Sequence, residues 1–214
     1  MSKALDVDRI AVLVHEVRSP VAAVSAIAET LADGEVDHEA RKTLVRLVVL
    51  ACASIERIVT DVAIASIRFE PVDPRHLVGD VVAAARVRGA TLELTAAAEV
   101  PSVQGDPPRL TQALDNLIAN ALAHGASDEP VSVSVTADTM VRIAVSDTGS
   151  GIGPDDLDRI FAAHVRIEPD LSPGSGLGLA LARAIAAGHG GSLAVASTVG
   201  AGATFTLSLP FAES

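Results

Sequence analysis

Residues 10–31 read IAVLVHEVRSPVAAVSAIAETL, and this stretch decides the fold of the first part of the chain. Its large apolar residues recur at steps of three and four, which is the spacing of a helix that packs along one seam. The sequence Asp33-Gly34-Glu35 that follows breaks the helix. We therefore predict one amphipathic helix over residues 4–32. Its predicted seam consists of Ile10, Val14, Val17, Val21, Val24, Ala28 and Leu31, with Leu13 and Ile27 beside it.

His15 lies inside this helix but off its apolar seam. If Ile10 occupies heptad position a, His15 falls at position f and faces solvent. Ser19 lies one turn further along the same exposed face, and Glu16 flanks the imidazole. Pro20 cannot donate a hydrogen bond to the Glu16 carbonyl, so we expect a bend just after the histidine. A histidine placed this way is either an ordinary surface residue or a nucleophile that another domain can reach, with Glu16 orienting the ring or taking its proton.

The composition limits the classes of function. Of the 214 residues, 49% are apolar and only 2% are aromatic, so the core must be built from Val, Leu, Ile and Ala. The formal net charge of −11 argues against a nucleic-acid partner and against an anionic membrane surface. The single cysteine, Cys52, cannot form an intrachain disulfide, and no apolar run approaches the ~20 residues of a transmembrane helix. We therefore expect a cytoplasmic protein that makes no direct contact with a membrane through this chain.

A second helical seam follows the break at residues 33–35. Two long amphipathic helices joined by a short turn predict an antiparallel hairpin, whose outer apolar stripe needs a partner. A second copy of the chain would supply one and give a dimeric four-helix bundle; the alternative is that the stripe packs on the chain's own second half. The prolines at 71 and 74 end this unit, so we predict a hairpin domain over residues 1–69 and a second domain over 70–214. The second seam consists of Leu44, Leu47, Val48, Ala51, Ile55, Ile58, Val62 and Ala65.

The second part of the chain mixes short strands and helices without regular alternation, which favours an α+β layer over a doubly wound sheet. Asp73-Pro74 is typical of a helix N-cap followed by proline at the first helical position. Residues 162–175 have the composition of a loop. The patterns predict helices over residues 74–88, 107–123 and 177–187, and β-like runs over residues 91–95, 102–104, 131–136, 141–145, 192–197 and 203–209.

Four blocks in this second part indicate a nucleotide site. Asn116 and Asn120 lie four residues apart on one helix face, where an amide oxygen suits Mg²⁺ bound to a triphosphate. Asp147 follows a strand and opens the sequence DTGSGIG, so its carboxylate can accept a hydrogen bond from an exocyclic amine such as adenine N6. The sequence GSGLGL at 174–179 opens a helix, whose free amides can cradle phosphate. A candidate hydrophobic anchor and phosphate cation lie between these blocks: Arg159, Ile160, Phe161 and Arg166.

With these motifs in this order, the chain resembles the two-component sensor histidine kinases of bacteria. The segment HEVRSP at 15–20 resembles their phosphoacceptor box, and the later blocks resemble the N, G1, F and G2 boxes of their ATP-binding domain. That domain is an α/β sandwich similar to those of gyrase and the Hsp90 chaperones, and the resemblance covers about residues 5–211. It implies a homodimeric, autophosphorylating kinase that passes the γ-phosphoryl group of ATP to His15 and then to an aspartate of a response regulator. The stimulus and any separate sensory partner are left open.

The resemblance also carries roles over to individual residues. His15 is the expected phosphate acceptor with Glu16 beside it, and Ser19 stands where many members have a threonine used in phosphatase action. Asn120 is the expected Mg²⁺ ligand and Asn116 lines the catalytic site, so ATP and Mg²⁺ are the expected cofactors. The other expected nucleotide-binding residues are Asp147 for adenine, Arg166 for the terminal phosphate, and Gly149, Gly151, Gly174, Gly176, Leu177 and Gly178 for the pocket and lid.

Asn116 separates a kinase from an ATPase. The ATP-hydrolysing relatives have a glutamate there that activates water, whereas an amide cannot act as a base near neutral pH. Ala123 departs from the family, which commonly has Lys or Arg there, so we expect weaker ATP binding or slower transfer. Two alternatives stay open. The first is a histidine phosphotransfer protein with a degenerate ATP-binding domain, and the second is an ATPase of the gyrase type or a kinase acting on protein Ser/Thr, neither of which would need His15. Four histidines belong to no motif and are expected to be ordinary surface or boundary residues: His38, His76, His124 and His189.

Overall fold

The structure is a computed structural model that describes residues 2–33, 36–65, 67–126, 128–161 and 178–212. The side chains of residues 2–16, 33, 53, 56, 57 and 59–65 are outside the description. The chain divides into two compact units, Met1–Val62 and Ala63–Ser214. No helix within the described ranges combines the length and the apolar character needed to cross a lipid bilayer.

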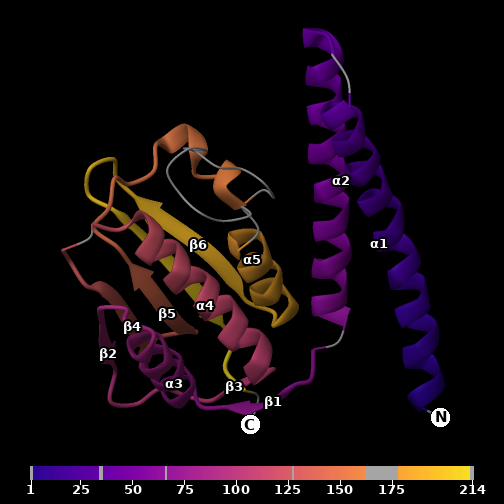
Figure 1. The fold of residues 1–214 in the computed structure, drawn as a ribbon. Helices are drawn as coiled ribbons and strands as arrows, with labels where there is room; N and C mark the ends of the chain where they lie inside the picture. Colours follow the sequence, from indigo (N-terminus) through magenta and orange to yellow (C-terminus); the bar gives the residue numbers. More distant parts are fainter. Residues whose placement is uncertain (1, 34–35, 66, 127, 162–177, 213–214) are drawn as a thin grey trace. The chain divides into compact units, whose positions relative to one another are not determined.

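The first unit contains the helix α1 (Ser2–Asp33) and all but the last turn of the helix α2 (His38–Ala65), both shown in Figure 1. Helix α1 continues through Pro20, which is buried together with Ile27, while Val17, Val24 and Leu31 are half-buried. The predicted seam is therefore wrong in part, because the buried face follows the steps 17–20–24–27–31. Two of its predicted members, Val21 and Ala28, lie one residue beyond that face and are exposed.

In α2 the predicted seam holds better among the side chains that the structure describes. Ile58 is buried, and Leu44, Val48, Ala51 and Ile55 are half-buried, whereas Leu47 is exposed.

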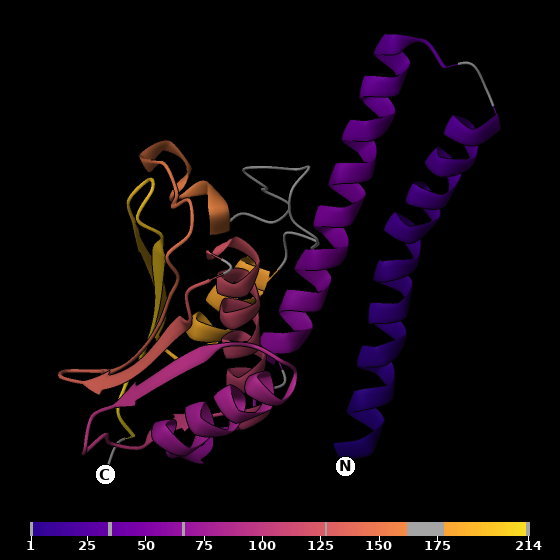
Figure 2. The same ribbon diagram turned by 60° about the vertical axis from the view of Figure 1, so that its left-hand side comes forward.

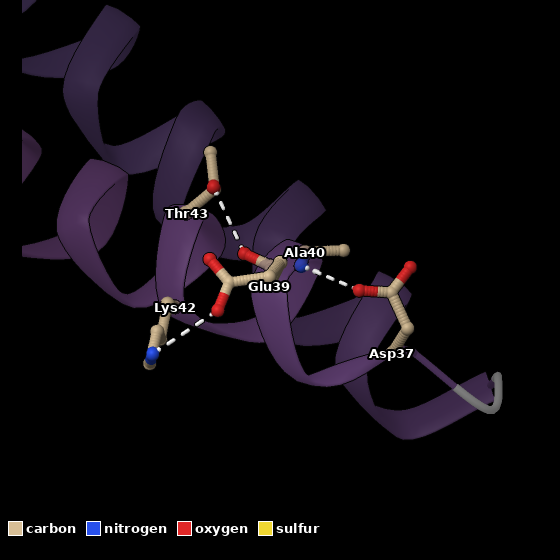
Figure 3. A network of polar contacts seen from close by, with 5 residues as sticks. All are labelled: Asp37, Glu39, Ala40, Lys42 and Thr43. Atoms are coloured by element: carbon tan, nitrogen blue, oxygen red, sulfur yellow. Dashed lines mark hydrogen bonds and ion pairs between the residues drawn. The ribbon is translucent and has the colours of Figure 1, made fainter.

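The start of α2 is fixed by local hydrogen bonds (Figure 3). The Asp37 side chain accepts from the Ala40 N–H at 2.8 Å, which satisfies one of the free amides of the first turn. The Thr43 hydroxyl donates to the Glu39 carbonyl at 3.0 Å. The ion pair of Lys42 with Glu39, at 3.1 Å, joins two well-exposed side chains and contributes little to stability. The helix therefore begins at a defined cap directly after the predicted break.

The second unit is a five-stranded sheet with helices on one face, as Figures 1 and 2 show, and the predicted α+β class is confirmed. Its strand order is β2-β4-β5-β7-β6, in which only the β2–β4 pair is parallel. Two single turns of 3-10 helix, η1 (Pro154–Asp156) and η2 (Arg159–Phe161), follow β5. The elements are β1 (Glu70–Val72), α3 (Pro74–Val87), β2 (Leu92–Ala96), β3 (Val103–Gly105), α4 (Pro107–His124), β4 (Val131–Ala137), β5 (Val141–Ser146), α5 (Gly178–Gly188), β6 (Ser192–Ser197) and β7 (Ala203–Leu209).

Alternation along the central strands decides which face of the sheet is buried. In β4, β5 and β7, every second residue is buried under the helices, and the residues between them are mostly Ser, Thr or Ala. The helices α4 and α5 pack against each other over this face, and α3 packs on α4 and β2. Because aromatic residues are so few, the largest fully buried side chains are one phenylalanine with leucines, isoleucines and valines, as the composition predicts. The largest of them are Phe205, Leu110, Leu114, Leu117, Ile143, Ile185, Leu207 and Leu209.

The cap at Asp73 is as predicted, but the strand before it is not. The Asp73 side chain accepts from the N–H groups of Arg75 and His76, and Pro74 occupies the first turn of α3. Residues 70–72, which we interpreted only as a boundary, form β1 and pair antiparallel with β3. This two-stranded sheet tolerates Pro71 because a strand with one partner leaves its other edge without ladder bonds.

A buried polar network joins β3, α4, α5 and the segment before β1. The Asp106 carboxylate caps α4 by accepting from the Arg109 N–H at 3.1 Å, and its other oxygen accepts from the Arg68 N–H at 2.9 Å. The Asp106 N–H donates to Nε2 of His189 at 2.9 Å, so the ring proton lies on Nδ1 and is donated to the Ile185 carbonyl at 2.7 Å. Only two residues separate the end of α2 at Ala65 from Arg68.

The prediction that His189 is an ordinary surface or boundary residue is therefore wrong. The side chain is 3% exposed, and its ring also contacts Phe69 edge to face at a centroid distance of 5.5 Å. The prediction fails because both hydrogen-bond partners are backbone groups, which leave no side-chain pattern in a sequence. His38, His76 and His124 are exposed, as expected.

We expect His189→Ala to lower the free energy of unfolding by about 2–3 kcal/mol, because it removes the acceptor of a buried N–H and leaves a cavity beside Phe69. Urea denaturation of the full chain, followed by circular dichroism, measures the change. His76→Ala is the matched control, since that side chain is 81% exposed and its loss should change stability by less than about 0.5 kcal/mol. Equal midpoints for the two variants would contradict a stabilising role for His189.

Candidate functional site

The helix α4 places Asn116 and Asn120 on one face, as their spacing predicts. Both residues are half-buried, and Nδ2 of Asn116 is fully buried without a hydrogen-bond partner among the described residues. Gly178, the first residue of α5, lies against this amide, because a Cβ atom there would be 3.5 Å from the Asn116 side chain. A buried N–H of this kind costs free energy unless a partner is supplied. This corner of α4 and α5 therefore suits a ligand that carries acceptor oxygens.

Asp147 directly follows β5 and is 7% exposed. Its backbone N–H donates to the Ala203 carbonyl at 2.9 Å, and its Oδ1 accepts from the Gly149 N–H at 2.9 Å. No hydrogen bond to Oδ2 is found within the described residues, so this oxygen is the one available to a ligand. A carboxylate oxygen oriented in this way can accept a hydrogen bond from a donor such as an exocyclic amine.

The glycines after Asp147 are required by close packing. A Cβ atom at Gly149 would lie 1.8 Å from the His124 carbonyl oxygen at the end of α4. Gly151 has a φ of +69°, and a Cβ atom there would lie 2.1 Å from the Thr198 carbonyl oxygen. The loop thus runs between the end of α4 and the turn that joins β6 to β7. The fold in this way brings Asp147 to the same end of α4 as Asn120, which lies one turn before His124.

The predicted hydrophobic anchor is buried. Ile160 and Phe161 in η2 are buried, and the Phe161 ring meets Phe205 edge to face at a centroid distance of 6.3 Å. The guanidinium of Arg183 on α5 lies 5.2 Å from the centroid of the Phe161 ring, within cation–π range. Arg159 forms an ion pair with Asp156 at 2.7 Å. The anchor therefore fixes the chain just before residue 162 to α5 and to the core.

Several predicted site residues fall outside what the structure describes. Arg166, Gly174, Gly176 and Leu177 lie outside the described residues. His15 and Glu16 lie on α1, but their side chains are outside the description, while Ser19 is exposed on the same helix.

No motif in the sequence indicates Gly202, although this residue contacts the loop. Its φ is +82°, and a Cβ atom there would lie 2.0 Å from the Asp147 carbonyl oxygen. In the sequence it belongs to an ordinary hairpin turn between two strands, and such turns use glycine for conformational reasons alone. Only the tertiary contact distinguishes it from a turn glycine.

We expect Gly149→Ala to weaken the binding of an adenine nucleotide at least tenfold, since the new methyl group must displace either the loop or the end of α4. Gly153→Ala is the matched control in the same loop, because a Cβ atom there meets nothing within 4 Å. Calorimetric titration of both variants with AMPPNP, a non-hydrolysable ATP analogue, measures the effect. If both variants bind as the unaltered chain does, the loop does not shape the site.

Comparison with known proteins agrees with this geometry. Residues 105–213 match the family described as histidine kinase-, DNA gyrase B-, and HSP90-like ATPase. The sensor-like histidine kinase SenX3 of Mycobacterium tuberculosis is 32% identical over 218 aligned residues, which cover 95% of this chain and 53% of that protein. The sensor histidine kinase ZraS of Escherichia coli is 34% identical over 213 residues, covering 92% of this chain and 43% of that protein. The chain thus spans about half the length of these curated relatives.

Two solved structures extend the likeness to the fold. Full-length ShkA in complex with AMPPNP has a TM-score of 0.65 and 28% identity, covering 97% of this chain and 46% of that one. The mycobacterial sensor histidine kinase MprB has a TM-score of 0.60 and 27% identity, covering 67% of this chain and 98% of that one. The resemblance drawn from the sequence is confirmed, and the chain belongs to the family of histidine kinase-, DNA gyrase B-, and HSP90-like ATPases, with sensor histidine kinases as its relatives.

Proposed function

We propose that the chain is an ATP-dependent, autophosphorylating histidine kinase of a two-component system. The observation that carries the proposal is Asn116, whose buried amide has no partner among the described residues and which stands where hydrolytic relatives have a base. An amide can position a nucleotide but cannot deprotonate water near neutral pH. A site that holds ATP without activating water favours transfer to another nucleophile over hydrolysis.

The nucleotide would be held by the groups that the fold brings to the end of α4. Oδ2 of Asp147 would accept from the exocyclic amine of adenine, since Oδ1 is already engaged by the Gly149 N–H. Asn116 would donate its buried Nδ2–H to a ligand oxygen. The start of α5 at Gly178 has no side chain beyond the α-carbon, so backbone amides there can approach phosphate. Arg166, Gly174, Gly176 and Leu177 would complete the phosphate side of the pocket, as the resemblance implies.

A magnesium ion fits the donor set next to this amide. Asn120 offers an uncharged hard oxygen one turn after Asn116, and Mg²⁺ bound to a nucleotide needs few protein ligands because phosphates and waters supply the rest. When bound, the ion neutralises negative charge on the phosphates during transfer. Ala123 supplies no further positive charge nearby, which favours weak rather than tight nucleotide binding.

The acceptor would be a ring nitrogen of His15. That nitrogen forms the new bond to the γ-phosphorus while the bond to the bridging oxygen breaks and ADP leaves with the electron pair. The proton on the opposite nitrogen is held or taken by Glu16. The phosphoryl group would then pass to an aspartate of a response regulator. Ser19, on the exposed helix face, would be available for the later hydrolysis of that aspartyl phosphate, in which water takes the phosphoryl group.

Exposed apolar side chains on the first unit support assembly as a homodimer. Helical hairpins bury such side chains by pairing into four-helix bundles. A second copy presents the same surface and gives a symmetric contact. The low cysteine content agrees with a cytoplasmic location. Among the side chains of this unit that the structure describes, the large apolar ones that are exposed are Val21, Val45, Leu47, Val49 and Leu50, with Leu50 64% exposed.

We expect the chain to take up label from γ-labelled ATP in the presence of Mg²⁺, in a bond that is labile to acid and stable to base. His15→Ala and Asn120→Ala should each abolish labelling, because the first lacks the acceptor and the second lacks the metal ligand. Scintillation counting after acid and base treatment measures the outcome. His38→Ala is the matched control, since this histidine is exposed on the same unit and should leave labelling unchanged.

Label that persists in His15→Ala would contradict the assigned acceptor. If the unaltered chain takes up no label, titration with AMPPNP separates the alternatives. Binding without labelling would indicate a missing activating partner. No binding would favour a histidine phosphotransfer protein with a degenerate ATP-binding domain, which Ala123 also favours.

A further inference from the structure

The turn that joins β6 to β7, residues 198–202, and the first residue of β7 contact the glycine-rich loop of residues 147–153, which we call the base loop. At its start, the Asp147 N–H donates to the Ala203 carbonyl at 2.9 Å. In its middle, the Ser150 carbonyl accepts from the Gly200 N–H at 2.7 Å. Gly151 packs so closely on the Thr198 carbonyl that it has no room for a side chain. The hairpin is therefore the support on which the base loop takes its shape.

One side chain of the hairpin, Ser197, forms hydrogen bonds both to the base loop and to the turn between β6 and β7. The Ser197 hydroxyl accepts from the Ile152 N–H at 2.8 Å, near the end of the base loop. The same hydroxyl donates to the Gly202 carbonyl at 2.6 Å. Gly202 packs against the Asp147 carbonyl, because a Cβ atom at Gly202 would lie 2.0 Å from that oxygen. A single hydroxyl thus links the Ile152 end of the loop to the residue that supports its Asp147 end.

Each of these bonds has a geometric consequence for Asp147. Without the Ser197 hydroxyl, the half-buried Ile152 N–H loses its acceptor, and the Gly202 carbonyl keeps only a longer bond, of 3.3 Å, from the Thr198 N–H. The base loop then has one attachment fewer over seven residues, while the strand pairing of β6 with β7 is unchanged. The group whose position depends on the loop is the Asp147 carboxylate, whose Oδ1 accepts from the Gly149 N–H of the same loop.

We propose that Ser197 is a positioning residue for the adenine-reading carboxylate of Asp147, acting through the backbone of the base loop. The inference rests on the proposed function, because it supposes that Asp147 reads adenine. Ser197 does not itself contact the nucleotide in this account. Its role is to hold the donor and acceptor geometry that distinguishes adenine, which presents an amine, from guanine, which presents a carbonyl at the same position.

A pair of nearly isosteric variants isolates the hydroxyl. Ser197→Thr keeps the hydroxyl and Ser197→Val replaces it with a methyl group, and both β-branched residues suit a strand. We expect Ser197→Val to weaken AMPPNP binding about five- to tenfold, the effect of losing roughly one hydrogen bond, and Ser197→Thr to stay within about twofold. The ratio of affinities for ATP and GTP should fall in Ser197→Val. In labelling kinetics, KM for ATP should rise while kcat stays within about twofold.

The controls separate positioning from folding and from the proposed function. Ser192→Val makes the same replacement at the far end of β6, on an exposed side chain for which no hydrogen bond is found within the described residues, and should leave affinity unchanged. Thermal denaturation of every variant shows whether it is folded at the titration temperature. Equal affinities for Ser197→Val and Ser197→Thr, or a loss of affinity with an unchanged ATP to GTP ratio, would overturn the role of the hydroxyl. If the unaltered chain binds no nucleotide, both the proposed function and this inference are overturned; if it binds and the variants do not differ, only the inference is.

Discussion

The placement of the helices α4 and α5 in the second unit depends on the hydrogen bonds of Asp106. Its carboxylate caps α4 and its backbone N–H is accepted by His189, so the first turn of α4 is fixed against the last turn of α5. Both helices carry site residues at their opposite ends, Asn120 on α4 and Gly178 on α5. A buried network with every partner satisfied is rigid, and a shift in it would be passed along both helices.

The site built on this frame consists largely of backbone and amide groups. Asp147 is oriented by the Gly149 N–H, and the base loop is shaped by contacts that leave no room for side chains. This construction reconciles the net charge of −11 with an anionic nucleotide, because amides, helix starts and a metal ion can hold phosphate without an excess of lysine and arginine. The acidity of the chain therefore restricts its macromolecular partners without excluding its small ligand.

Much of the fold could be predicted from periodicity and caps, since these depend on neighbours in sequence. The strands and helices of the second unit lie within about two residues of their predicted bounds, with the exception of β1. The predictions that failed concern residues whose partners are distant in sequence. The strand β1 pairs with β3 despite its proline, and His189 bonds to a backbone N–H 83 residues away. The site residues could be named from motifs, yet Gly202 and Ser197 could not. A turn glycine and a strand serine acquire their roles only through tertiary contacts, that of Gly202 with Asp147 and that of Ser197 with Ile152.

The bond between the Arg68 N–H and Asp106 also limits the length of chain between the end of α2 and the nucleotide unit. It fixes the chain to the nucleotide unit only three residues after the end of α2, a span of at most about 11 Å. Two parts of a chain that are joined by so short a segment meet at an effective concentration of millimolar order, in place of free diffusion. Weak attraction between parts joined in this way is then sufficient for an encounter, and each encounter can be brief.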